Sequence, residues 1–202
     1  MYAVLPPENF RLLNFPHASG AKSPRCIVWL HGMGERGDDL SLVSKYGLPA
    51  ALNEGRLTVN ADVICPQLEA GLAWSAERLA HLMAGLGKQY EASALLGYSL
   101  GADGVCQLLA QLGSQASIHI AIAPGASVPI VANQAATRFL VISGEGDPWL
   151  DAEAFLQAVR ASGGEADHAV MLGEGHYISE SALTHPKLVT ALASIGIDFV
   201  WR

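Results

Sequence analysis

The segment Ala94–Gly104, which reads ALLGYSLGADG, constrains this chain more than any other. An apolar run of strand length ends in the pentapeptide G-Y-S-L-G, and a helix-patterned segment follows at once. A serine on such a sharp strand-to-helix turn adopts strained backbone geometry, so the positions two before and two after it must be small. Gly97 and Gly101 meet that requirement. We therefore expect Ser99 to stand at the end of a strand with its hydroxyl exposed. The pentapeptide also arises by chance in glycine-rich chains, so its meaning depends on the rest of the sequence.

Apolar runs of strand length alternate with helix-period segments from about residue 25 to the C-terminus. The expected strands are Cys26–Leu30, Asp62–Cys65, Ala92–Leu96, Ile118–Ile122, Phe139–Ser143 and His168–Leu172, with Phe10–Phe15 as a further candidate. Most are continuous apolar runs, which is typical of strands covered on both faces in a parallel sheet.

Helical stripes of apolar residues fall between these runs. Helices are expected around Leu79–Leu86, with Ser75 as N-cap, around Val105–Leu112, over Asp151–Ser162, and from Pro186 onward. Ile197–Arg202 is left unassigned. The alternation predicts the α/β class, as a three-layer α/β/α sandwich with a mostly parallel, doubly wound sheet. Because the connections are short, we expect residues 1–202 to form one domain without a cap.

The composition argues against several classes of protein. Half of the 202 residues are hydrophobic and 15% are charged, which is typical of a globular chain. The formal net charge is −7 and there is no basic run, so nucleic acid is not an expected partner. No apolar stretch approaches the ~18 residues of a membrane span, and Met1–Phe15 lacks the features of a signal peptide. The three cysteines, Cys26, Cys65 and Cys106, lie in apolar segments and favour a reducing compartment, so a cytoplasmic location is expected.

Reactive residues follow several of the expected strands, where open α/β sheets bind their ligands. Ser99 follows the third main strand, Asp147 the fifth and His176 the sixth, which is the chain order of a Ser-Asp-His triad on this type of sheet. Serine needs an adjacent base to become a nucleophile, and imidazole can accept and then return the proton. A carboxylate on the far ring nitrogen fixes the tautomer and stabilises the imidazolium.

Other residues compete for the acid and base roles. Glu145 and Asp151 lie close to Asp147 in the sequence, and His185 precedes the last helix. We favour Asp147 because it lies a few residues beyond a strand end, where a loop can reach a histidine. We favour His176 because it lies in a glycine-containing loop directly after an apolar strand.

An oxyanion hole needs two backbone N–H donors. The helix after the nucleophile offers the N–H of Leu100, with the positive end of the helix dipole behind it. The loop after the first main strand, which reads His31-Gly32-Met33-Gly34, supplies the second donor, expected at Met33.

With these residues in place, the chain resembles α/β-hydrolases of the phospholipase/carboxylesterase branch, close to dienelactone-hydrolase-like esterases. The motifs that carry the resemblance are Leu30–Asp38, Gly97–Gly101, Gly144–Pro148 and Gly175-His176, within a match that runs from Cys26 to the last helix. The resemblance implies hydrolysis of carboxylic esters or thioesters by Ser99, Asp147 and His176, with Met33 and Leu100 as oxyanion donors. It also implies that the reaction needs no metal or organic cofactor. Dienelactone hydrolases proper carry a cysteine nucleophile, and the short region before Cys26 leaves room for fewer early strands.

The expected function is that of a serine carboxylesterase acting on a small-molecule ester or thioester. Acyl thioesterase or lysophospholipase activity is the alternative within catalysis, and a catalytically silent binding module on a hydrolase fold is the alternative outside it. Trp74 and Trp149 are candidate substrate-binding residues. An acidic rim that disfavours anionic substrates is expected from Glu35, Asp38, Asp39, Glu145 and Glu174.

Overall fold

The computed structural model describes residues 10–17, 20, 23–125, 129–147 and 152–202. In this part of the chain, the main sheet has seven strands in the order β1-β4-β2-β5-β6-β7-β8. They are β1 (Arg11–Phe15), β2 (Arg25–Leu30), β4 (Asp62–Gln67), β5 (Ala92–Tyr98), β6 (Ile118–Ile122), β7 (Arg138–Gly144) and β8 (Glu165–Met171). Only β1 runs antiparallel to its neighbour, β4. The prediction of a mostly parallel sheet is confirmed.

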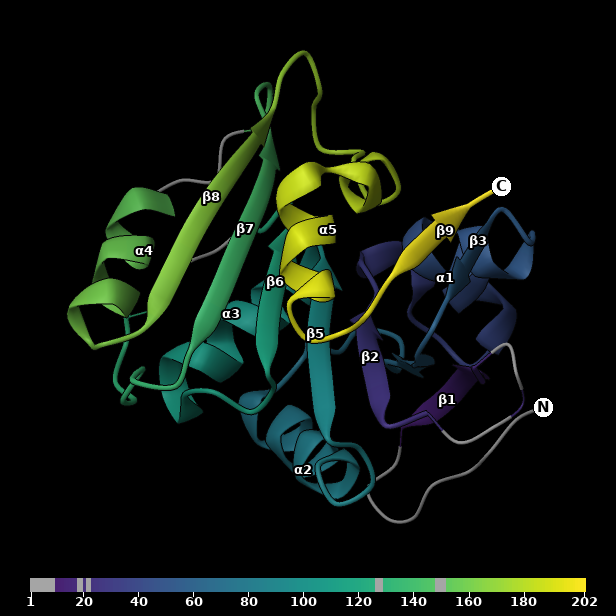
Figure 1. Ribbon diagram of the computed structural model, residues 1–202, viewed down its shortest axis with the longest axis horizontal. Coiled ribbons are helices and arrows are strands. Elements are labelled where there is room, and N and C mark those ends of the chain that lie inside the picture. The colour runs from purple at the N-terminus through teal and green to yellow at the C-terminus, as the bar shows by residue number, and fades with distance from the viewer. Residues whose placement is uncertain (1–9, 18–19, 21–22, 126–128, 148–151) are drawn as a thin grey trace.

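Helices cover both faces of the sheet and give three layers (Figure 1). On one face lie α2 (Ala76–Leu86), α3 (Leu100–Leu112) and α4 (Ala152–Ala161), which share one hydrophobic cluster with the strands. On the other face lie α1 (Gly47–Asn53), α5 (Pro186–Ala193) and a small sheet of β3 (Leu57–Val59) and β9 (Phe199–Trp201). These elements share a second cluster with the opposite faces of the same strands. The sandwich is therefore held by two cores.

The central strands are buried along almost their whole length, as their continuous apolar runs predict. The edge strand β8 differs, because its residues alternate between exposed and partly buried positions up to Ala169. Its first three residues include the charged Glu165 and Asp167 and form no apolar run, so the predicted start at His168 was three residues too late. Ser75 caps α2 as expected, with its hydroxyl accepting the Arg78 N–H at 3.2 Å.

Three short elements were absent from the prediction, namely α1, β3 and β9. Each is at most seven residues long, so no periodic pattern can establish itself. The remaining elements of the described residues are three 3-10 turns, η1 (Met33–Glu35), η2 (Leu40–Ser44) and η3 (Ser181–Thr184), so no cap domain occurs there. None of the described helices is long and apolar enough to span a bilayer.

The strand order places a topological switch point between β2 and β5. From β2 the chain moves to one side to form β4 and then crosses back to pair β5 with the other edge of β2. The loops that leave the carboxyl ends of β2 and β5 therefore diverge to opposite faces, and open α/β sheets bind their ligands outside such a point. These two loops carry His31–Gly34 and Ser99.

Candidate active site

Ser99 occupies a strained turn between the last residue of β5, Tyr98, and the first residue of α3, Leu100. Its backbone has φ 52° and ψ −117°, a conformation that costs a non-glycine residue about 1–3 kcal/mol. Two flanking glycines make the turn possible. A Cβ atom at Gly97 would overlap the Gly101 carbonyl, and a Cβ atom at Gly101 would overlap the Leu30 carbonyl. The requirement for small residues on both sides of Ser99 therefore has a direct steric cause.

His176 lies between Ser99 and Asp147. Its Nε2 is 3.0 Å from Ser99 Oγ, and its Nδ1 is 2.5 Å from Asp147 Oδ2. Because an ionised carboxylate only accepts hydrogen bonds, Nδ1 carries the proton and the Nε2 lone pair faces the serine hydroxyl. The His176 and Asp147 side chains are 38% and 33% exposed, so the pair is open to a ligand from solution. The three residues singled out in the sequence are brought together.

The competing residues are engaged elsewhere. The Glu145 carboxylate accepts the Gly173 N–H at 3.0 Å, and the His185 ring accepts the Lys187 N–H at the start of α5 at 3.2 Å. Asp151 lies outside the described residues. A second Ser–His contact occurs between Ser143 Oγ and His168 Nε2 at 2.9 Å, but Ser143 is only 3% exposed.

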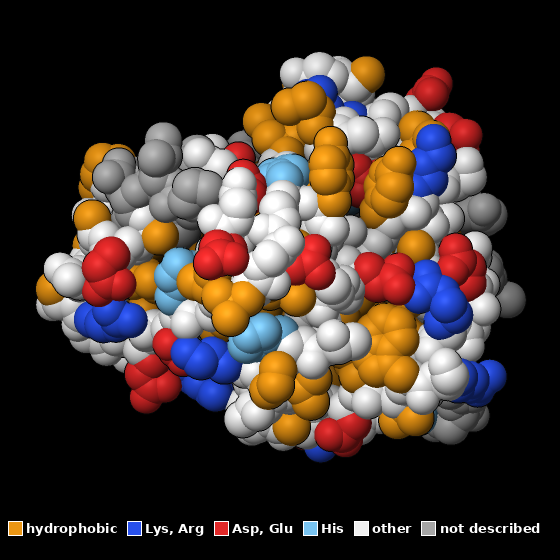
Figure 2. All heavy atoms as spheres, turned by 90° about the horizontal axis from the view of Figure 1, so that it is seen from above, with side chains coloured by type: hydrophobic (Ala, Val, Ile, Leu, Met, Phe, Trp, Pro, Cys, Tyr) orange, Lys and Arg blue, Asp and Glu red, His pale blue; other side chains and the backbone are white. Residues whose placement is uncertain are grey.

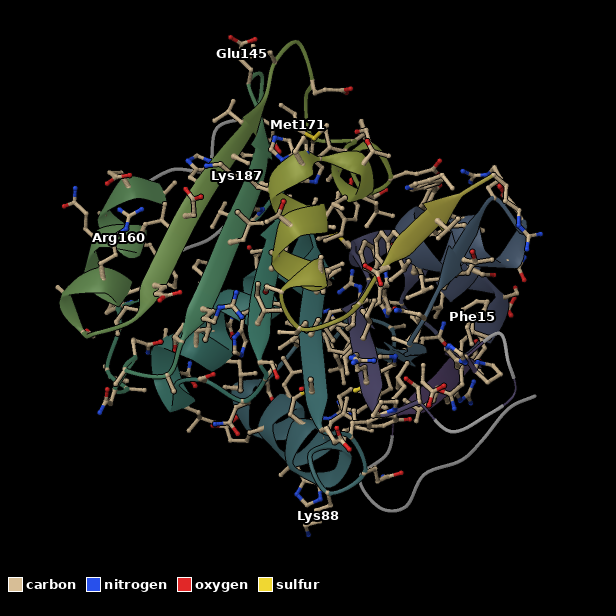
Figure 3. All side chains as sticks on the ribbon, in the orientation of Figure 1. Phe15, Lys88, Glu145, Arg160, Met171 and Lys187 are labelled. Atoms are coloured by element: carbon tan, nitrogen blue, oxygen red, sulfur yellow. The ribbon has the colours of Figure 1, made fainter. Side chains whose placement is uncertain are left out.

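The loops that carry Asp147 and His176 are joined to each other above the sheet. Glu145 N–H donates to the Met171 carbonyl at 3.0 Å, and Gly146 N–H donates to the Glu174 carbonyl at 2.8 Å. A Cβ atom at Gly144 would overlap the backbone of Gly175, so the two loops are in direct contact. In Figure 3, Glu145 marks the tip of the first loop at the top of the molecule, where the two loops rise side by side.

The loop after β2 is anchored by a buried histidine. The His31 ring donates from Nδ1 to the Gly32 carbonyl at 2.6 Å and accepts the Leu68 N–H at Nε2 at 3.0 Å. Its own carbonyl accepts the indole N–H of Trp74 at 3.2 Å. Burial lowers the pKa of His31 to about 4, so the ring is neutral at pH 7 and can serve as the acceptor. This histidine fixes the loop and has no exposed surface with which to contact a substrate.

Met33 and Leu100 each begin a helical turn, η1 and α3 respectively. The first N–H groups of a helical turn have no partner within it and are free to bind an anion. The two turns adjoin, because Gly101 packs against the Leu30 and His31 carbonyls. Met33 is 62% exposed, and its carbonyl accepts Arg36 Nε–H at 3.1 Å.

The two tryptophans singled out in the sequence have different outcomes. Trp74 is only 2% exposed, and its ring packs 5.1 Å from the His31 ring and 5.7 Å from the Phe10 ring, measured between centroids. The expectation that it contacts substrate is wrong, because it belongs to the core beneath the loop after β2. Trp149 lies outside the described residues.

The acidic rim also needs correction. Glu35 is 3% exposed, because η1 turns its side chain inward, and burial raises the pKa of its carboxyl group. It is therefore not a rim residue. Asp38, Asp39 and Glu145 are exposed and Glu174 is partly buried. Figure 2, which looks onto the edge formed by the carboxyl ends of the strands, shows acidic and hydrophobic side chains over its centre, with lysine and arginine mostly toward its margins.

Two aromatic residues beside Ser99 and His176 were missed in the sequence. Tyr98 precedes Ser99, and its ring centroid lies 5.7 Å from that of His176. Tyr177 follows His176 and is 91% exposed, with its ring centroid 5.9 Å from the imidazole. Their position next to Ser99 and His176 in the sequence was the available signal. Among the described residues, no group of three or more His, Cys, Asp or Glu side chains is placed to hold a metal ion.

Comparison with solved structures places this arrangement among known folds. A thermostable esterase superposes with a TM-score of 0.67 at 16% identity, over 92% of this chain and 58% of its own length. Esterase PE8 gives 0.62 at 19% identity, over 93% and 98% of the two chains. A phospholipase/carboxylesterase from Dyadobacter fermentans gives 0.63 at 14% identity, over 94% and 97%. The chain has an α/β-hydrolase fold.

This α/β-hydrolase fold confirms the resemblance seen in the sequence at the level of structure. No protein-family model matches the chain, and no curated protein matches it in sequence. The motifs around Ser99 and His31 could be recognised because the sterics of the fold constrain them. Over the aligned residues, the chain is only 14–19% identical to these esterases.

Proposed function

We propose that the protein is a serine carboxylesterase that cleaves small-molecule carboxylic esters through an acyl-enzyme intermediate. The observation that carries the proposal is the position of His176, within hydrogen-bond reach of both Ser99 and Asp147. The α/β-hydrolase fold and its esterase neighbours support ester hydrolysis in general.

In the proposed reaction, Ser99 Oγ attacks the ester carbonyl carbon while His176 Nε2 takes up the hydroxyl proton. The carbonyl oxygen becomes an oxyanion that receives the N–H groups of Met33 and Leu100. The C–O bond to the alcohol then breaks, and His176 returns the proton to the leaving oxygen. Water, activated in the same way, hydrolyses the acyl-serine and releases the acid. Asp147 keeps the proton on Nδ1 throughout and stabilises the imidazolium.

The nucleophile is tested with a fluorophosphonate probe, which modifies activated serines. We expect wild type to be labelled and Ser99→Ala to remain unlabelled. Ser143→Ala is the matched control, because Ser143 also contacts a histidine but is buried. Labelling that survives in Ser99→Ala and disappears in Ser143→Ala would contradict the assignment. Folded wild-type protein that is neither labelled nor active on any ester would favour the binding module instead.

The substrate class is tested by comparing three kinds of acyl donor. We expect short p-nitrophenyl esters to be hydrolysed with a higher kcat/KM than acyl thioesters or lysolipids, since no cap covers the site among the described residues. A preference for thioesters or lysolipids would instead support the thioesterase or lysophospholipase alternative.

The three cysteines are free and buried, which fits the cytoplasmic location that we propose.

A further inference from the structure

Tyr98 joins the strand that carries the nucleophile to the loop that carries the base. It is the last residue of β5 and only 8% exposed. Its phenol O–H donates to the backbone carbonyl of His176 at 3.2 Å, and its ring is tilted 38° to the imidazole at a centroid distance of 5.7 Å. The buried phenol hydroxyl of Tyr98 thus bonds to the backbone of His176, which leaves both imidazole nitrogens available to Ser99 and Asp147.

The same ring lies against the loop after β2. A Cβ atom at Gly32 would lie 3.4 Å from Tyr98 Cδ1 and 3.5 Å from Cε1, which is close contact without overlap. Gly32 directly precedes Met33, the proposed oxyanion donor. Tyr98, at the end of β5, therefore lies against the loops that follow β2 and β8.

Side chains on either side of His176 pack little against the rest of the molecule. Leu172 and Tyr177, which lie on either side of His176, are 79% and 91% exposed, and Ile178 is the first fully buried residue after it. The Ile178 N–H donates to the His176 carbonyl at 2.9 Å, a contact inside the loop itself. The bond from Tyr98 ties the same carbonyl to the sheet, next to the rigid turn at Ser99.

We propose that Tyr98 is a positioning residue that sets the separation of His176 from Ser99 by holding the backbone of the base against the residue that precedes the nucleophile. This inference rests on the proposed hydrolase function. Its physical basis is that the close glycine contacts at Gly97 and Gly101 hold the backbone around Ser99, so the Tyr98 phenol links the His176 carbonyl to a fixed part of the sheet. Small displacements of reacting groups reduce rates strongly, so a single hydrogen bond has a measurable effect on catalysis.

The first test removes only the hydroxyl. We expect Tyr98→Phe to lower kcat for a p-nitrophenyl ester by about threefold to tenfold with KM unchanged, the range of one neutral hydrogen bond. Tyr90→Phe is the matched control, because Tyr90 also donates one hydrogen bond, to Asp62 Oδ2 at 2.9 Å, before the start of β5 and far along the strand from Ser99. Equal losses of kcat in the two variants would overturn the proposal, since a general loss of stability would then explain both.

The second test is a double-mutant cycle with His176→Ala, assayed on an activated ester. If Tyr98 acts through His176, Tyr98→Phe should have no further effect once the imidazole is gone. A Tyr98→Phe effect of the same size in both backgrounds would overturn the proposal and place the residue's influence on the loop after β2.

A third measurement does not depend on turnover. We expect the proton between His176 Nδ1 and Asp147 Oδ2, which lie 2.5 Å apart, to give a far-downfield NMR signal in the ligand-free protein. We expect this signal to exchange faster with water in Tyr98→Phe than in wild type or Tyr90→Phe. An unchanged signal would refute the positioning role even in an active enzyme. Failure of wild type to react with any ester or probe would refute the hydrolase proposal separately.

Discussion

The buried His31 makes a quantitative prediction about acid stability. Its ring is fully buried, and its pKa lies at about 4 in the folded chain, against about 6.5 in the unfolded chain. Between pH 4 and pH 6.5 the unfolded chain therefore binds more protons at this residue than the folded chain does. The contribution of His31 to stability is complete above pH 6.5 and is lost as the pH drops toward 4. Between pH 6.5 and pH 5 the loss spans 1.5 units, and at 1.36 kcal/mol per unit it amounts to about 2 kcal/mol.

The assay is urea unfolding of wild type and His31→Gln at pH 7.5 and pH 5. Glutamine can still accept the Leu68 N–H but does not titrate, so the stability advantage of wild type should shrink by about 2 kcal/mol at the lower pH. The buried His119, whose pKa burial also lowers to about 4, contributes equally to both proteins and cancels. Gly85→Ala, in open space on α2, is the control, because it changes no titrating group and should alter stability by the same amount at both pH values. An advantage of wild type that stays constant with pH would refute a neutral buried His31.

Three further outcomes are expected. Asp147→Asn should lower kcat by roughly 10³–10⁴ because it leaves the imidazole in the wrong tautomer, whereas Glu145→Gln should leave kcat near wild type. Equal losses of kcat in an esterase assay would contradict the role of Asp147. Gly101→Ala should cost about 3 kcal/mol or more in urea unfolding because its Cβ would overlap a backbone carbonyl, while Gly85→Ala, in open space on α2, should stabilise by up to about 1 kcal/mol. Ser75→Ala should destabilise by about 1 kcal/mol through the lost cap without changing kcat, and an unchanged unfolding midpoint would contradict the cap's contribution.

The main sheet could be predicted because its strands are buried on both faces. Ile118–Ile122 has the same limits in the prediction and the structure, and the other central strands gain residues only at their ends. Short or exposed elements gave weaker signals. Residues 199–201 form a strand only because they pair with residues 57–59, and no local pattern records that long-range contact.

The catalytic candidates could be predicted because chain order and strand ends fix which loops meet. Which residues of a loop are buried could not be predicted. Trp74 and Glu35 both stand near the expected site in the sequence, yet one supports a loop from the core and the other is turned inward by a single 3-10 turn. Tyr98 was missed for the opposite reason. As the variable position of the G-x-S-x-G pentapeptide it carries no steric demand of its own, and its hydrogen bond to a residue 78 positions away exists only in the folded chain.

The contact between the loops after β7 and β8 has a consequence for how such a site can change. Gly144 and Gly175 touch backbone to backbone, and hydrogen bonds run from Glu145, Gly146 and Gly173 across the two loops. An insertion in one loop would break these bonds unless the other changed with it. The loops of Asp147 and His176 therefore have to change together. A wider or narrower entrance to the site should be obtained only by exchanging both loops at once.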